Sequence, residues 1–181
     1  MNKSHGFSSF SLFENGQHPL DDEWIALDLE TTGLEPYKDE IIEIGAVRFN
    51  KHEILDTFQS LVNPSLKLGS FTKRFTGISQ EDVDSAPSFD NVSTKLISFI
   101  NDSPIVGHNI SFDLGFLESN GIRLTNPRSD TLDLAYVLKP CEPEYNLSKI
   151  AESLSISHLR PHRALNDAKI TATLFQTLVK D

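Results

Sequence analysis

Two carboxylates, Asp28 and Glu30, lie two residues apart in a segment whose other residues are typical of a strand. In a strand over Trp24–Glu30 both would occupy one face, with Leu29 on the other. Their Cα atoms would then lie about 6.6 Å apart. Carboxylates at that separation can straddle two cations that lie roughly 3.5–4 Å from each other. An exposed strand end with two solvated acids would give the same local pattern.

The residues that follow this pair, Thr31-Thr32-Gly33-Leu34, combine small hydroxylated side chains with a glycine. Such a segment lets a ligand come close to the backbone. It is equally typical of a strand that simply ends in a turn.

A second polar motif follows a short apolar strand predicted at Pro104–Gly107. His108 and Asn109 lead into a helix that we expect Ser111 to cap, with Asp113 in the first turn. Ligands of α/β sheets bind at the carboxyl ends of strands. The alternative is structural, because an acid at a helix start is favourable in itself and the other two polar side chains could bond to loop backbone.

A third motif, His162-Arg163-Ala164-Leu165-Asn166-Asp167, opens the last predicted helix, which begins at about Arg163. Asp167 falls one turn into that helix, between small residues that permit close packing on a sheet. A histidine has an ordinary pKa near 6.5, which suits it to accept a proton at neutral pH. His162 could instead serve only as a helix-entrance residue that bonds to backbone.

The elements that must position these groups follow from hydrophobic spacing. Short links join three predicted strands into an antiparallel meander: Trp24–Glu30, Ile41–Phe49 and Ile54–Val62. Helical spacing then recurs around four groups of residues: Phe89 to Ile100, Phe112 to Leu117, Thr131–Leu138, and Leu147 to Leu154 behind an Asn146 cap. A meander followed by alternating strands and helices predicts an α/β fold with a mixed sheet.

Length and composition limit the classes of protein. The 181 residues suffice for one domain; we expect residues 1–22 to be a flexible leader or a strap, and 23–181 to fold. The net charge of −10 excludes a broad cationic coat for nucleic acid. A single cysteine excludes a disulfide framework. Neither a membrane-length apolar run nor a signal peptide is evident, so a cytoplasmic setting is expected.

Taken together, the three motifs resemble the DEDDh exonucleases, the DnaQ-like branch of the ribonuclease H-like fold. The matching segments are Asp28-Leu29-Glu30-Thr31, His108-Asn109-Ile110-Ser111-Phe112-Asp113 and His162-Arg163-Ala164-Leu165-Asn166-Asp167. The resemblance covers Trp24 to Val179 and extends to the proofreading subunit of bacterial DNA polymerase III and to helicase- or polymerase-linked exonuclease domains. It implies a five-stranded mixed sheet, an antiparallel meander followed by parallel strands, flanked by helices.

The resemblance further implies a 3′→5′ exonuclease that releases nucleoside 5′-monophosphates from single-stranded or frayed DNA. Two divalent ions, Mg²⁺ or Mn²⁺, would be held by four acids: Asp28, Glu30, Asp113 and Asp167. His162 would be the general base. The residues expected to contact the terminal nucleotides are Thr31, Thr32, Leu34, His108, Asn109 and Phe112.

Three hypotheses of function remain open from the sequence. The first is a DNA exonuclease with a polymerase or helicase partner and a role in proofreading or repair, DNA being favoured over RNA. The second is an exoribonuclease on the same fold, and the third a non-catalytic nucleic-acid-binding module. The candidate cations for guiding the strand are Lys73, Arg74, Arg160 and Arg163, although each of them taken alone is more typical of a solvated surface charge. No membrane association is expected.

Overall fold

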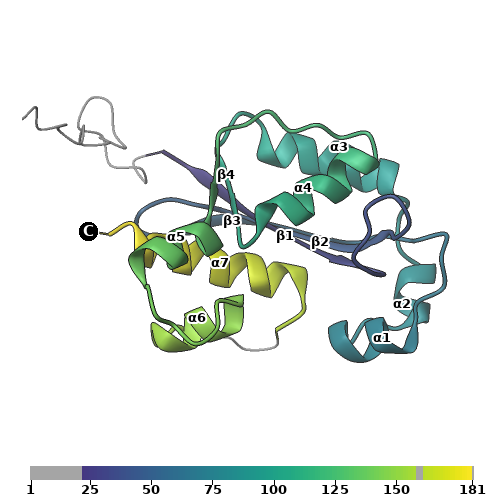
Figure 1. Ribbon diagram of the computed structural model, residues 1–181. Helices are drawn as coiled ribbons and strands as arrows, with labels where there is room; N and C mark the ends of the chain where they lie inside the picture. Colours follow the sequence, from purple (N-terminus) through teal and green to yellow (C-terminus); the bar gives the residue numbers. More distant parts are fainter. Residues whose placement is uncertain (1–21, 158–160, 181) are drawn as a thin grey trace, which may run out of the picture.

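The computed structural model describes residues 22–157 and 161–180, and within them a five-stranded mixed sheet lies between two layers of helices (Figure 1). The strands are β1 (Trp24–Thr31), β2 (Ile41–Phe49), β3 (Ile54–Leu61), β4 (Ile105–Gly107) and β5 (Arg128–Asp130). The helices are α1 (Ser70–Thr76), α2 (Gln80–Asp84), α3 (Phe89–Ile100), α4 (Ile110–Ser119), α5 (Thr131–Leu138), α6 (Leu147–Ser153) and α7 (Ala164–Leu178). The leader expected at 1–22 lies outside the described residues, apart from its last position.

The strand order is β3-β2-β1-β4-β5. β1, β2 and β3 pair antiparallel, while β4 and β5 run parallel to β1. The predicted meander and mixed sheet are therefore confirmed. Parallel pairing of β1 with β4 involves only Ile25 and Ala26, so the two strands separate toward their carboxyl ends.

The two faces of β1 contribute to different cores, as the alternation of its side chains predicted. Ile25, Leu27 and Leu29 pack with residues of α3 and α4. On the opposite face Ala26 packs with Ala168 and with other residues of α7. That second face becomes polar at Asp28, the next residue on that face, at the level where α7 begins.

The cap of α4 differs from the prediction, because the helix begins at Ile110 and Ser111 is inside it. Asn109 is the N-cap residue, in a left-handed conformation with φ 66°. The Asp130 carboxylate at the end of β5 accepts the N–H groups of Asn109 and Ile110, each at 2.9 Å. An acid far away in sequence thus replaces the local serine cap.

Candidate active site

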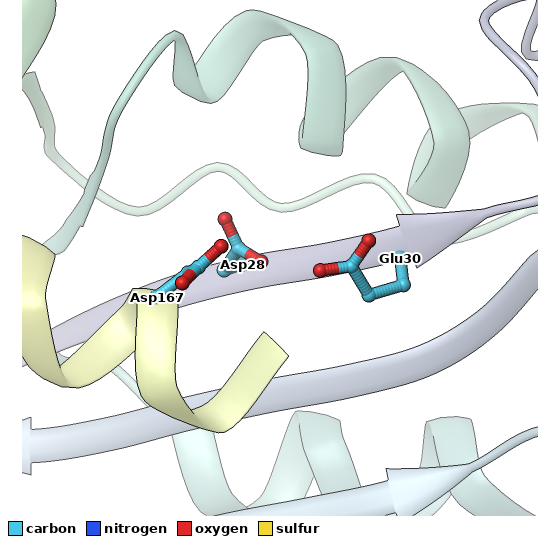
Figure 2. A group of neighbouring side chains, drawn as sticks. All are labelled: Asp28, Glu30 and Asp167. Atoms are coloured by element: carbon cyan, nitrogen blue, oxygen red, sulfur yellow. The ribbon is translucent and has the colours of Figure 1, made fainter. Parts of the chain in front are cut away.

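Three carboxylates meet at the carboxyl end of β1 (Figure 2). Asp28 and Glu30 come from the strand and Asp167 from the first turns of α7, and ligand oxygens of all three lie within 4.8 Å of one another. Glu30 and Asp167 are buried and Asp28 is half-buried. The β1–β2 register shifts between Glu30 and Thr31, so the sheet is irregular at this point.

Asp113 lines the same pocket but is not one of these three. It is buried in the first turn of α4, and its Oδ1 accepts the N–H of Leu29 at 2.9 Å. β4 no longer pairs with β1 at that level, so the carboxylate satisfies a strand amide that lacks a neighbouring strand.

Burial and mutual repulsion disfavour the charged forms of these acids. Burial first, and then the charges of Asp113 and Asp167, raise the pKa of Asp28 well above its ordinary value. Burial first, and then the charges of Asp167 and Glu43, raise the pKa of Glu30 to about 8, and burial raises the pKa of Asp113. Divalent cations such as Mg²⁺ prefer hard oxygen ligands, and the charge of such a cation would stabilise the ionised form of these carboxylates. The residues present therefore fit a divalent metal site.

His162 lies beside the carboxylates, directly before α7. Its backbone is left-handed, with φ 65°, and its N–H donates to Oδ2 of Asp167 at 3.0 Å. Its ring stacks on Phe75 of α1, with 3.6 Å between the ring centroids and 28° between the planes. A hydrogen bond from its backbone N–H therefore holds the predicted base, His162, next to the predicted acid of the same motif, Asp167.

A pocket of about 580 Å³ opens over these groups. All six residues predicted to contact a nucleotide line it: Thr31, Thr32, Leu34, His108, Asn109 and Phe112. The side chain of Leu34 is 80% exposed at its mouth. The fold thus brings all six to one cavity, and their contact with a nucleotide stays a prediction.

Several of these residues also hold the wall together. Thr32 donates its N–H to the carbonyl of Glu40 at 2.8 Å, and its hydroxyl accepts the Glu40 N–H at 3.0 Å. His108 lies with Nε2 2.8 Å from the Tyr145 carbonyl and Nδ1 2.9 Å from the Thr131 hydroxyl. Burial lowers the pKa of His108, and the Tyr145 carbonyl, which can only accept, requires a proton on Nε2.

Sequence reasoning missed one wall of the pocket, which α1 supplies. Phe71 and Phe75 line it and stack on each other, with ring centroids 5.4 Å apart. Thr72 fixes the helix to the β1 loop by donating its hydroxyl to the Thr32 carbonyl at 3.0 Å. The spacing of the two aromatics by four residues was the available signal.

The structure describes three of the four candidate cations for guiding a strand, and they differ in how free their side chains are. Lys73 and Arg74 are exposed in the last turn of α1. Arg163 is instead engaged with buried Glu43, its Nη2 lying 2.7 Å from Oε1, so the prediction of a strand-guiding role does not fit its position. Arg160 lies outside the described residues.

An α/β sheet that gathers three acids and a histidine at the carboxyl end of its first strand is an architecture of metal-dependent nucleases. The exonuclease family model matches residues 25–175, and the chain belongs to that family. It is a DnaQ-like 3′→5′ exonuclease domain, as its motifs predicted.

Comparisons with individual proteins agree with this assignment. The chain is 39% identical over 160 residues to the PolC-type DNA polymerase III of Caldanaerobacter subterraneus subsp. tengcongensis, covering 86% of this chain and 11% of that protein. The PolC-type polymerase of Thermotoga maritima is also 39% identical, over 162 residues covering 87% of this chain and 12% of that protein. This chain therefore spans about an eighth or less of these relatives.

Solved structures support the fold. The nuclease domain of 3′hExo, a DEDDh family member bound to rAMP, superposes with a TM-score of 0.77 at 26% identity, covering 88% of this chain and 92% of that one. Exonuclease X in complex with 5′ overhanging duplex DNA gives 0.75 at 25% identity, covering 87% and 91%. Among the described residues, no helix is both long and apolar enough to traverse a bilayer.

Proposed function

We propose that this domain removes nucleotides one at a time from the 3′ end of single-stranded or frayed DNA, with proofreading or repair as its role. The observation that carries the proposal is the convergence of Asp28, Glu30 and Asp167 beside His162 in one open pocket. The PolC-type relatives, which are DNA polymerases, favour DNA and a polymerase partner. We place the protein in the cytoplasm and take residues 23–181 as the functional unit.

In this proposal Asp28, Glu30, Asp113 and Asp167 hold two divalent ions, Mg²⁺ or Mn²⁺. When bound, such ions neutralise phosphate charge, activate water and stabilise a leaving oxygen. The four negative charges of the carboxylates equal the four positive charges of two divalent ions. The occupied site would therefore be neutral, although the protein as a whole is acidic. The raised pKa of Glu30 supports the proposal, because a bound cation would stabilise the charged form of this carboxylate.

His162 accepts the proton of the attacking water at a ring nitrogen. Its ring is stacked on Phe75, which lies on the pocket wall. The stack restricts the ring to one plane facing the pocket. A base fixed in orientation loses less entropy when the substrate arrives.

The pocket walls would receive the terminal nucleotides. Leu34, Phe112 and the α1 aromatics offer apolar surface on which any base can stack, so weak sequence preference is expected. Lys73 and Arg74 lie on the same short helix as these aromatics, where they would attract the strand.

An exoribonuclease is the second candidate, favoured by the likeness to a 3′-exonuclease whose solved structure concerns end-specific recognition of a histone mRNA stem-loop. That structure superposes with a TM-score of 0.75 at 26% identity. At the pocket, the deoxyribonuclease and the exoribonuclease differ only in whether the site accepts a sugar with a 2′-hydroxyl group.

One experiment tests the proposal and separates the candidates. The wild-type protein is incubated with 5′-labelled DNA and RNA oligomers of one sequence in Mg²⁺, beside His162→Ala. We expect DNA to shorten in single-nucleotide steps and to release nucleoside 5′-monophosphates. Equal or faster loss of RNA would favour the exoribonuclease. Binding without cleavage would leave only the non-catalytic module.

A further inference from the structure

Glu43 is a buried carboxylate that the proposed chemistry does not use. It lies on β2 opposite Glu30 of β1, and its exposed fraction is zero. A buried carboxylate is costly unless it is paired and fully hydrogen-bonded. In the strand Ile41–Phe49 the only other charged residue is Arg48, near the far end.

The partners of Glu43 are three residues from two separate segments. Arg163 donates from Nη2 to Oε1 at 2.7 Å and from Nε to Oε2 at 3.0 Å, a forked contact. Gln59 of β3 donates from Nε2 to Oε1 at 2.8 Å, and Ala164 donates its backbone N–H to Oε2 at 3.0 Å. The carboxylate therefore ties the middle of the sheet to the chain just before α7.

Glu43 also performs the role of a helix cap for α7. The N-cap position is Arg163, whose side chain makes no capping bond. The first N–H of the helix, that of Ala164, is accepted by Glu43 from the neighbouring strand. Gly45 allows this close approach, because a Cβ there would lie 2.2 Å from the backbone carbon of Ala164.

This anchor lies next to His162. A histidine with φ 65° is in a sparsely populated conformation that persists only where the surroundings hold it. Asp167 holds the His162 N–H on one side, and Glu43 holds the next two residues on the other.

We propose that Glu43 is a positioning residue, which fixes the backbone of His162 and the start of α7 through Arg163 and Ala164. It touches neither substrate nor metal. The inference rests on the proposed function, in which His162 is the base, and adds a residue on the sheet that determines where that base stands.

The test uses Glu43→Gln and Arg163→Met, with Arg163→Lys as the variant that keeps the positive charge. Glutamine keeps the shape but turns an amide NH₂ toward groups that are all donors. We expect kcat on a DNA oligomer to fall roughly 10- to 100-fold in the first two variants, because small misplacements of a reacting group have effects of this size. KM should change by less than about threefold, and Arg163→Lys, which keeps the charge but not the forked contact, should recover part of kcat.

Amide hydrogen exchange at Ala164 gives a second readout that needs no activity. We expect faster exchange in Glu43→Gln and an unchanged rate in Glu23→Gln, a control that breaks the ion pair of Arg48 at the other end of β2. An inactive wild type would end the proposed function, and exchange would still test the anchor. Unchanged exchange with kcat within about twofold, or a rise in KM alone, would overturn the positioning role.

Discussion

At the scale of single residues, the site consists of groups whose ionisation the fold disfavours. Asp28 and Glu30 are acids in a place where the apolar layer of α7 stops. They are costly to the metal-free protein and useful only with cations. Their presence is better explained by chemistry than by stability.

Replacing His162 should remove catalysis and little else. For His162→Ala we expect kcat to fall by roughly 10²–10⁴-fold, the usual contribution of a general base, with Mn²⁺ affinity retained in a calorimetric titration. Alanine is disfavoured at φ 65°, so His162→Asn is the companion variant, since asparagine tolerates the left-handed region. A wild-type rate in both variants would show that another group takes the proton.

Replacing Asp28 should have opposite effects on activity and on metal-free stability. Asp28→Asn removes a charge that burial and neighbouring acids disfavour, so the Tm in chelator should rise. Activity in Mg²⁺ should fall at least ~10²-fold, because a metal ligand is lost. Asp133→Asn, at an exposed position of α5, is the control and should change neither quantity. A lower Tm in chelator would contradict the electrostatic account.

At the scale of elements, the position of α7 decides whether the site exists. It delivers Asp167 and follows His162 directly, and its first turn lies against β2. Hydrophobic periodicity predicted this helix and the main strands, because each covers enough residues to show a repeat. α1, α2 and the three-residue β5 are too short for that signal, and the sequence did not locate them.

Asp28 and Glu30 could be found because they stand on a strand face where apolar residues are expected, whereas Asp113 and Asp167 were found because their motifs resemble those of a known family. The Asp130 cap of α4 and the Glu43 anchor could not, because both depend on side chains that meet only after distant segments pack. The α1 wall left only a weak signal, the four-residue spacing of Phe71 and Phe75, because this short helix has no longer apolar stripe.

The close approach of α7 to β2 can be tested at Gly45. Gly45→Ala places a Cβ 2.2 Å from helix backbone, so α7 must move. We expect a loss of about 1–3 kcal/mol in chemical denaturation, the usual cost of overpacking, together with lower kcat. Gly115→Ala within α4 is the matched control, because its Cβ would meet only Pro36 at 3.5 Å. Equal stability of the two variants would show that α7 is not tightly seated.

At the scale of the whole molecule, stability should depend on pH and metal together. Glu30 has a pKa of about 8 in the folded state against an ordinary 4.5, so between these values the folded protein binds a proton that the unfolded chain releases. The free energy of unfolding of the metal-free protein must therefore decrease as pH rises from about 5 to 8, and Glu30 alone contributes at most about 1.4 kcal/mol for each pH unit.

The measurement is a series of thermal melts from pH 5 to 8 in EDTA and in Mg²⁺. We expect Tm to fall with pH in chelator and Mg²⁺ to raise it most at pH 8, where the carboxylates are ionised. The chelated protein should also be inactive, and activity should return with Mg²⁺ or Mn²⁺. Full turnover in chelator would refute the metal-dependent mechanism.

The bond from Leu29 to Asp113 has a practical consequence for trapping an intact oligonucleotide on the protein. Asp113 accepts the Leu29 N–H where β1 and β4 no longer pair. Asp113→Ala would therefore leave a buried peptide N–H without its acceptor, at a cost of about 1–3 kcal/mol. Complexes obtained with such a variant would report on a damaged scaffold. Inactivation at His162 leaves the hydrogen bond from Leu29 to Asp113 intact, so it is the better way to obtain a complex with an undisturbed fold.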